Sequence, residues 1–119
     1  MSRRILIVED EDAVSRTLQL ALGAVGYQTA AAATGHLALY EVATRDPDVI
    51  LLDLYLRGGM NGADFLKEYR AKGGRAKVIV ISGATRLDPI ARDLHADEFM
   101  GKPVDMERLL GSVRRFAYA

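Results

Sequence analysis

Residues 5–12 read ILIVEDED, a run of four apolar residues followed at once by four acids. Two further apolar runs, at 49–52 and 78–81, end in Asp53 and Ser82. Apolar runs of about four to eight residues without alternation are typical of strands that are buried on both faces. The chain is therefore expected to contain three buried strands, each followed by polar side chains.

Helical spacing fills the intervals between the runs, since apolar residues recur there three and four positions apart. Helices are predicted over residues 14–25, 35–45, 63–72, 89–94 and 106–116. Their ends carry cap signals, which are Thr34, Asp88 and Asp105 as N-caps and Gly26 and Gly73 after the last turns. Two weaker strand candidates, 27–32 and 97–100, complete an alternation of strand and helix that is repeated five times.

That alternation predicts an α/β fold. Strands that alternate with helices form parallel sheets with helices on both faces, and right-handed crossovers leave few topologies. The leading one is the flavodoxin-like, doubly wound (βα)5 fold, in which a parallel sheet of five strands has the order 2-1-3-4-5. The sequence shows no second domain, linker or repeat, so residues 1–119 are predicted to form a single domain without an output domain.

Composition excludes several classes of function. The chain has no cysteine, which excludes disulfides and thiolate metal sites. Sixteen basic residues balance 16 acidic ones, so the charge indicates neither a nucleic acid nor an anionic membrane as a partner. The apolar runs are far shorter than the roughly 20 residues that a membrane-spanning helix needs. The run after Arg4 is also too short for the core of a signal peptide. A cytoplasmic protein is expected.

The polar residues that follow the strands predict one site at one edge of the sheet. Ligands of open parallel sheets bind beyond the carboxyl ends of the strands, where the strand order reverses. The residues expected at this edge are Glu9, Asp10, Asp53, Ser82 and Lys102. Crowded carboxylates repel one another unless a cation lies among them, and hard oxygen ligands favour Mg²⁺ or Mn²⁺ over zinc. The alternative interpretation is that the acids from Glu9 onward only complement the dipole of the following helix.

Asp53 is the candidate reactive residue. A carboxylate at the end of a buried strand can act as a nucleophile toward a phosphoryl group. Such a reaction needs a metal ion and a second cation to neutralise the charge of the transferring group. Asp10 with Mg²⁺ can supply the first and Lys102 the second, while Ser82 can donate a hydrogen bond to a phosphoryl oxygen.

Four segments of the chain resemble the receiver domain of bacterial two-component response regulators. They are residues 5–11, 48–54 and 80–83 and the pair Lys102-Pro103, and the resemblance spans essentially the whole chain. It implies a phospho-accepting Asp53, with Mg²⁺ held by Asp10, by Asp53, by the backbone carbonyl of Tyr55 and, through water, by Glu9. It also implies Ser82 as the switch hydroxyl, Lys102 as the phosphate-pairing cation, Phe99 as the switch aromatic and a cis Lys102-Pro103 bond.

The resemblance further implies a function in phosphorelay signal transduction. A sensor histidine kinase or a histidine phosphotransferase donates the phosphoryl group to Asp53 in a Mg²⁺-dependent reaction. Ser82 then moves toward the phosphoryl group and Phe99 turns inward, which changes the binding face made by residues 89–94, 97–100 and 106–116. Such a domain is not an enzyme in the usual sense, because it catalyses only its own phosphotransfer and dephosphorylation. An unidentified downstream protein and a homodimer through the same face are both compatible with it.

Two segments depart from the commonest receiver pattern. The family usually has Pro where Arg57 stands and one residue fewer before Gly62, so residues 57–62 form a lengthened loop. This loop puts the backbone carbonyl of Tyr55 in question as a metal ligand. The segment between the switch hydroxyl and the phosphate-pairing lysine is shorter than usual, which shortens the helix expected at 89–94.

A third departure concerns the lifetime of the phosphoryl group. Tyr55 lies two residues after Asp53, and Ala84 lies two residues after Ser82. Both positions are expected to flank the phosphoryl group. A large ring and a small apolar side chain supply little that would orient a hydrolytic water, so slow self-dephosphorylation is the hypothesis.

Two other functions remain open. A pseudo-receiver would keep the fold and signal without phosphate, and the altered loop keeps this alternative open. A Mg²⁺-dependent phosphatase would use Asp53 as a turnover nucleophile, but such enzymes commonly carry an acid two residues later, where this chain has Tyr55. His36 and His95 are expected away from the strand ends, as solvated or partly packed side chains rather than phosphorelay residues. Composition does not decide between a stand-alone receiver and one trimmed from a longer chain.

Overall fold

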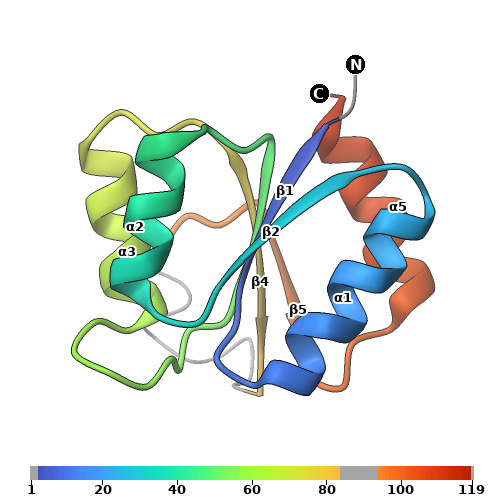
Figure 1. Ribbon diagram of the computed structural model, residues 1–119, viewed down its shortest axis with the longest axis horizontal. Coiled ribbons are helices and arrows are strands. Elements are labelled where there is room, and N and C mark those ends of the chain that lie inside the picture. Colours follow the sequence, from blue (N-terminus) through green and yellow to red (C-terminus); the bar gives the residue numbers. More distant parts are fainter. Residues whose placement is uncertain (1–2, 84–93, 119) are drawn as a thin grey trace.

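The computed structural model describes residues 3–83 and 94–118, which form a parallel sheet between two layers of helices (Figure 1). In chain order the elements are β1 (Arg4–Val8), α1 (Asp12–Ala24), β2 (Gln28–Ala32), α2 (Gly35–Thr44), β3 (Val49–Leu52), α3 (Gly62–Ala71), β4 (Lys77–Ser82), β5 (Glu98–Gly101) and α5 (Met106–Ala117). Apart from Leu94, the predicted helix at 89–94 lies outside the described residues, as do its cap Asp88 and the neighbouring Ala84.

The strands lie in the order β2-β1-β3-β4-β5, and every pairing is parallel. The predicted α/β class and the flavodoxin-like strand order are therefore confirmed. β1 is paired on both sides, so that Val8 lies between Ala32 of β2 and Leu52 of β3. The strand order reverses between β1 and β3, which places the carboxyl ends of these two strands side by side.

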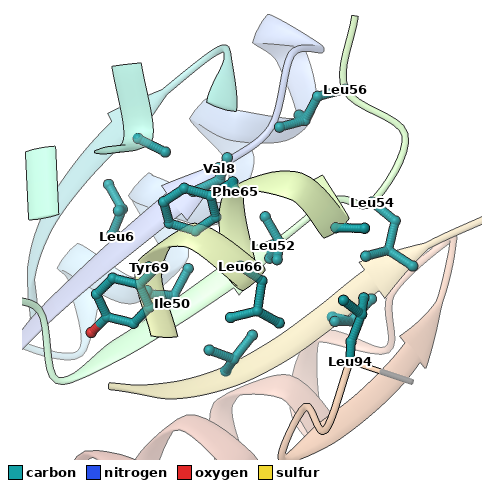
Figure 2. Packing of buried hydrophobic residues seen from close by; sticks show 14 of the residues in the cluster. Leu6, Val8, Ile50, Leu52, Leu54, Leu56, Phe65, Leu66, Tyr69 and Leu94 are labelled. Atoms are coloured by element: carbon teal, nitrogen blue, oxygen red, sulfur yellow. The ribbon is translucent and has the colours of Figure 1, made fainter. Parts of the chain in front are cut away.

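Both faces of the central strands are buried, with successive residues on opposite faces. Leu6 and Val8 belong to the core under α2 and α3, whereas Ile5 and Ile7 belong to the core under α1 and α5. None of the four is more than 1% exposed. Figure 2 shows the first core, where Phe65 of α3 lies over the strands. Burial on both sides is the physical reason for apolar runs that do not alternate with polar residues.

The helix ends follow the cap residues in the sequence. The side chains of Thr34 and Asp105 each accept a hydrogen bond from the backbone N–H three residues on, at 3.1 and 3.2 Å, as predicted. Asn61 does the same for α3 at 2.9 Å, so this helix begins one residue earlier than predicted. α1 ends before Gly26, whose φ of +101° suits glycine. No helix in the described part of the chain is long and apolar enough to cross a membrane.

Candidate functional site

Backbone hydrogen bonds extend the sheet past the ends of β1 and β3 and hold the first acids of the site. The Glu9 N–H donates to the carbonyl of Ala32 at 3.0 Å, and the Asp53 N–H donates to the carbonyl of Val8 at 2.9 Å. Glu9, Asp10 and Asp53 thereby converge, each offering a carboxylate oxygen within 4.8 Å of the other two. The predicted meeting of acids from two neighbouring strands is confirmed by this geometry.

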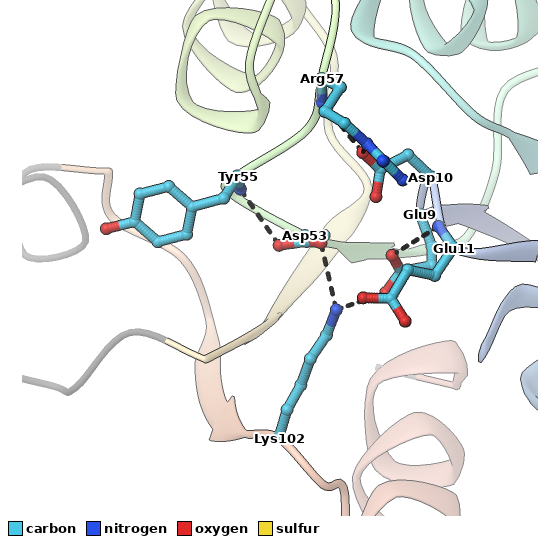
Figure 3. A network of polar contacts seen from close by, with 7 residues as sticks. All are labelled: Glu9, Asp10, Glu11, Asp53, Tyr55, Arg57 and Lys102. Atoms are coloured by element: carbon cyan, nitrogen blue, oxygen red, sulfur yellow. Dashed lines mark hydrogen bonds and ion pairs between the residues drawn. The ribbon is translucent and has the colours of Figure 1, made fainter.

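Lys102 reaches the acids from the end of β5, the strand at one edge of the sheet (Figure 3). It follows β5, where its N–H donates to the carbonyl of Ser82 at 3.1 Å. Its Nζ lies 2.7 Å from Oε1 of Glu9 and 3.1 Å from Oδ2 of Asp53. The side chains of Glu9 and Asp53 are only 4% and 9% exposed, so the ammonium group pairs with two largely buried carboxylates. The Lys102-Pro103 peptide bond is cis, as the resemblance implied.

Burial and charge oppose each other in this group. The pKa of Glu9 is raised, because burial and the negative charge of Asp53 outweigh the hydrogen bonds that Glu9 accepts from Lys102 and from the Glu11 N–H. For Lys102, burial lowers the pKa, but its hydrogen bonds to the two carboxylates outweigh burial and raise it. The ammonium form of Lys102 is therefore stabilised in this site.

Asp10 has a different partner, Arg57. The backbone N–H and the side-chain Nε of Arg57 both donate to Oδ2 of Asp10, at 3.0 and 2.9 Å. Burial raises the pKa of Asp10, but the two hydrogen bonds and the charge of Arg57 outweigh burial, so the pKa lies below its usual value. Sequence reasoning noted Arg57 only as a departure from the family pattern. Its position four residues after Asp53, across from a run of acids, was the available signal that it belongs to the site.

The remaining acids of the 9–12 run divide between two roles. Asp12 lies in the first turn of α1 and pairs with Arg16 one turn on, at 2.6 Å. Glu11 occupies the N-cap position of the same helix without a side-chain cap bond. The alternative interpretation, an acidic start of a helix, thus holds for the second half of the run, while Glu9 and Asp10 lie in the cluster.

Tyr55 and Ser82 lie at this edge of the sheet, whereas Phe99 lies within β5. The Tyr55 N–H donates to Oδ1 of Asp53 at 3.1 Å, while its ring points away from the acids and is about half exposed (Figure 3). Ser82 is the last residue of β4 and is buried. Phe99 lies opposite Val80 in the β4–β5 pairing and packs in part against the core under α2 and α3.

The two histidines lie outside the acidic cluster. His36 is an exposed residue in the first turn of α2, and His95 is an exposed residue of the segment before β5, with a φ of +54°. Neither belongs to the group of acids that could hold a metal ion.

The donor set of the acidic cluster fits a hard divalent cation. Glu9, Asp10 and Asp53 offer carboxylate oxygens only, without a histidine or a thiol in the group. Mg²⁺ and Mn²⁺ prefer such oxygen ligands, and Mg²⁺ commonly binds one or two carboxylates together with waters and phosphate oxygens. Among the residues that the structure describes, this cluster combines candidate metal ligands, a candidate nucleophile and a lysine.

Known proteins resemble this chain in sequence and in fold. The family model of the response regulator receiver domain matches residues 5–114. The KDP operon transcriptional regulatory protein KdpE of Escherichia coli is 36% identical over 111 residues, which are 92% of this chain and 49% of that protein. Sporulation initiation phosphotransferase F of Bacillus subtilis is 32% identical over 118 residues, which are 98% of this chain and 94% of that protein. The chain thus spans about half the length of the first relative and nearly the whole of the second.

The fold also has a close counterpart among solved structures. The crystal structure of a response regulator receiver domain protein (CheY-like) from Methanospirillum hungatei superposes with a TM-score of 0.90 at 26% sequence identity. The superposition covers 99% of this chain and 95% of the other.

Proposed function

This chain belongs to the response regulator receiver domain family, and we therefore propose that Asp53 accepts a phosphoryl group and thereby switches the binding of a partner protein. It is a receiver domain of phosphorelay signalling rather than a conventional enzyme. The observation that carries the proposal is the position of Asp53, which follows the buried strand β3 within reach of two acids and the Lys102 ammonium.

The chemistry proposed for Asp53 is a phosphoryl transfer from a phosphohistidine. A carboxylate oxygen of Asp53 forms a bond to phosphorus while the bond from phosphorus to the imidazole nitrogen breaks, and the imidazole takes the electron pair. Lys102 already donates to Oδ2 of Asp53 and is positioned to transfer this hydrogen bond to a phosphoryl oxygen. The Tyr55 N–H, which donates to Oδ1, holds the carboxylate in its orientation during the attack.

We assign the divalent cation site to Glu9, Asp10, Asp53 and the backbone carbonyl of Tyr55, with Mg²⁺ as the expected ion and Mn²⁺ as a substitute. The convergence of three carboxylates supports this assignment. When bound, the ion neutralises negative charge on the phosphoryl group. The protein's own contribution is to hold the acids together at the strand ends, through the hydrogen bonds that continue the sheet past Val8 and Leu52.

The proposed switch joins Ser82 to Phe99. Ser82 is buried at the end of β4, next to β3, the strand that precedes Asp53, and its movement toward a phosphoryl group would open space behind the hydroxyl. Phe99 lies on the neighbouring strand β5 and is only partly buried against the core, and we propose that its ring turns inward into this space. The outer surface of β5 and α5 then changes, which supplies a two-state element biased by one local charge.

A receiver domain implies a histidine kinase or a histidine phosphotransferase as its phosphoryl donor. We propose that a sensor histidine kinase or such a phosphotransferase of the cytoplasm is the direct donor for this chain. The downstream partner is proposed to be a protein that recognises the surface of β5 and α5, with a second copy of the chain as one candidate.

Intact-mass measurement tests the proposed acceptor. The protein is incubated with acetyl phosphate, with and without Mg²⁺, as the wild type, as Asp53→Asn and as Asp12→Asn, which removes an exposed acid outside the cluster. The wild type and Asp12→Asn are expected to gain one phosphoryl group only with Mg²⁺, and Asp53→Asn is expected to gain none. A folded wild type that gains no phosphoryl group, under conditions that phosphorylate a control receiver, would instead indicate a pseudo-receiver.

A further inference from the structure

The acidic cluster carries a second cation besides Lys102, and this cation lies on the lengthened loop. Three carboxylates, those of Glu9, Asp10 and Asp53, face the charges of Lys102 and Arg57. One negative charge is therefore in excess. Adding a divalent cation while both side chains stay in place would give the cluster a net positive charge. Releasing one of the two side chains restores neutrality.

We propose that Arg57 is a built-in competitor of the divalent cation for Asp10, and that ion binding is coupled to release of the Arg57 side chain. This inference rests on the proposed metal site. It goes beyond that site because it states that a loop residue that is not itself a ligand lowers the affinity of the site for the ion. The pairing that carries it is the 2.9 Å bond from Nε of Arg57 to Oδ2 of Asp10.

Arg57 is the cation that is easier to release. Its side chain is 80% exposed, whereas that of Lys102 is 24% exposed and bonds to two acids. An exposed guanidinium regains full hydration when it leaves, so the cost of breaking its ion pair is small. The Asp10 side chain by contrast is 13% exposed, and a divalent cation beside it stabilises its negative charge more strongly than the single charge of a guanidinium group does.

The loop backbone is anchored on both sides of Arg57, so release involves its side chain rather than the whole loop. Leu56 is buried in the core under α2 and α3. Farther along, Met60 packs so closely on the start of α2 that a Cβ atom on Gly35 would lie 2.6 Å from its Cγ. The Arg57 N–H therefore keeps its place beside Asp10 while the guanidinium moves. Competition is thus expected to depend on the side-chain charge.

Titration calorimetry with MgCl2 on the metal-free protein tests the coupling. Arg57→Gln is compared with the wild type and with Arg16→Gln, which removes a similarly exposed arginine whose partner is Asp12. Arg57→Gln is expected to bind Mg²⁺ about two- to fivefold more tightly, the range set by the strength of exposed ion pairs. Arg16→Gln is expected to match the wild type, and Asp10→Asn is expected to lose most of the affinity.

A second readout follows the ion pair itself. In a ¹H–¹⁵N NMR spectrum, the Arg57 Nε–H signal, assigned by its loss in Arg57→Gln, is expected to shift toward that of a solvated arginine as Mg²⁺ is added. If Arg57→Gln binds Mg²⁺ no more tightly than the wild type, or if the Nε–H signal is unchanged at saturation, the competition is disproved while the metal site stands. If neither protein binds Mg²⁺, the proposed metal site itself is wrong.

Discussion

The ammonium group of Lys102 lies 2.7 Å from the carboxylate of Glu9, although the strands that precede them are not neighbours in the sheet. β5 is separated from β1 by β4 and β3, and the side chains of Lys102 and Glu9 meet beyond the strand ends (Figure 3). On its way it also donates to Asp53, the residue after β3. One side chain thus joins the ends of three strands through charge-assisted hydrogen bonds, which are stronger than neutral ones.

Removing Lys102 is expected to destabilise the metal-free protein. Lys102→Ala leaves two largely buried carboxylates, Glu9 and Asp53, without their cation, and the free energy of unfolding should fall by about 1–3 kcal/mol. Urea denaturation in the presence of EDTA measures this loss. Lys72→Ala removes an exposed lysine of a helical ion pair as the control, and its effect should stay within about 0.5 kcal/mol. Equal stability of the two variants would contradict the assigned role of Lys102.

Glu98 forms ion pairs with two arginines, Arg108 and Arg115, so its contribution to the stability of the fold is predicted to depend on pH. Burial raises the pKa of Glu98, but hydrogen bonds from Ser112 and Arg108, together with the charges of Arg108 and Arg115, lower it below the ordinary value of 4.5. A carboxyl group whose pKa is depressed by folding stabilises the folded state above its unfolded pKa. That stabilisation is lost as the pH falls through the folded pKa.

Glu98→Gln is therefore expected to cost about 1 kcal/mol of unfolding free energy at pH 7, through the loss of a partly buried ion-pair network. The difference from the wild type should shrink as the pH falls below 4.5. Thermal or urea unfolding at several pH values measures it, with Glu68→Gln on the exposed face of α3 as the control. A difference that grows toward acid pH would contradict this account of Glu98.

The hydroxyl group of Tyr69 is predicted to stabilise the contacts of α3 with the segments before β3 and β4. It accepts a hydrogen bond from the buried Ala76 N–H at 2.9 Å and donates to Asp46 at 3.2 Å, while the ring is 3% exposed. Tyr69→Phe leaves the Ala76 N–H without this acceptor, and a loss of about 1–3 kcal/mol is expected in urea denaturation. Tyr40→Phe removes a hydroxyl from a ring that is 67% exposed and should change stability little. Matching curves for the two variants would show that the Tyr69 hydroxyl has no such role.

The expected slow self-dephosphorylation depends on Tyr55 and rests on the proposed phosphorylation of Asp53. The Tyr55 ring points away from the acids and is about half exposed, so its side chain offers no group to orient a water beside Asp53. Tyr55→Asn supplies an amide there, and the phosphoryl group should be lost severalfold faster. The half-life is followed by intact mass after removal of acetyl phosphate. Tyr55→Phe, which keeps the ring, is expected to decay like the wild type, and an unchanged half-life in Tyr55→Asn would refute the idea.

The fold could be predicted in detail because local patterns and long-range packing agree in this chain. Apolar runs such as 49–52 are buried on both faces, as their lack of alternation indicated. The predicted caps Thr34 and Asp105 hold their helices. Asn61 was missed as a cap because the apolar spacing of α3 becomes visible only after Gly62, and a side-chain hydrogen bond at a helix start has no periodic signal.

The parallel sheet, its strand order and the meeting of Glu9, Asp10 and Asp53 could be deduced from the residue pattern alone, because the carboxyl ends of neighbouring parallel strands must share one edge. The cation with which each of these acids pairs could be read only from the three-dimensional arrangement. Lys102 forms ion pairs with Glu9 and Asp53, and Arg57 forms one with Asp10. These choices depend on where a loop and a long side chain come to lie in space. Such positions follow from packing between segments that are far apart in the sequence. No local sequence pattern gives the distance between two such segments.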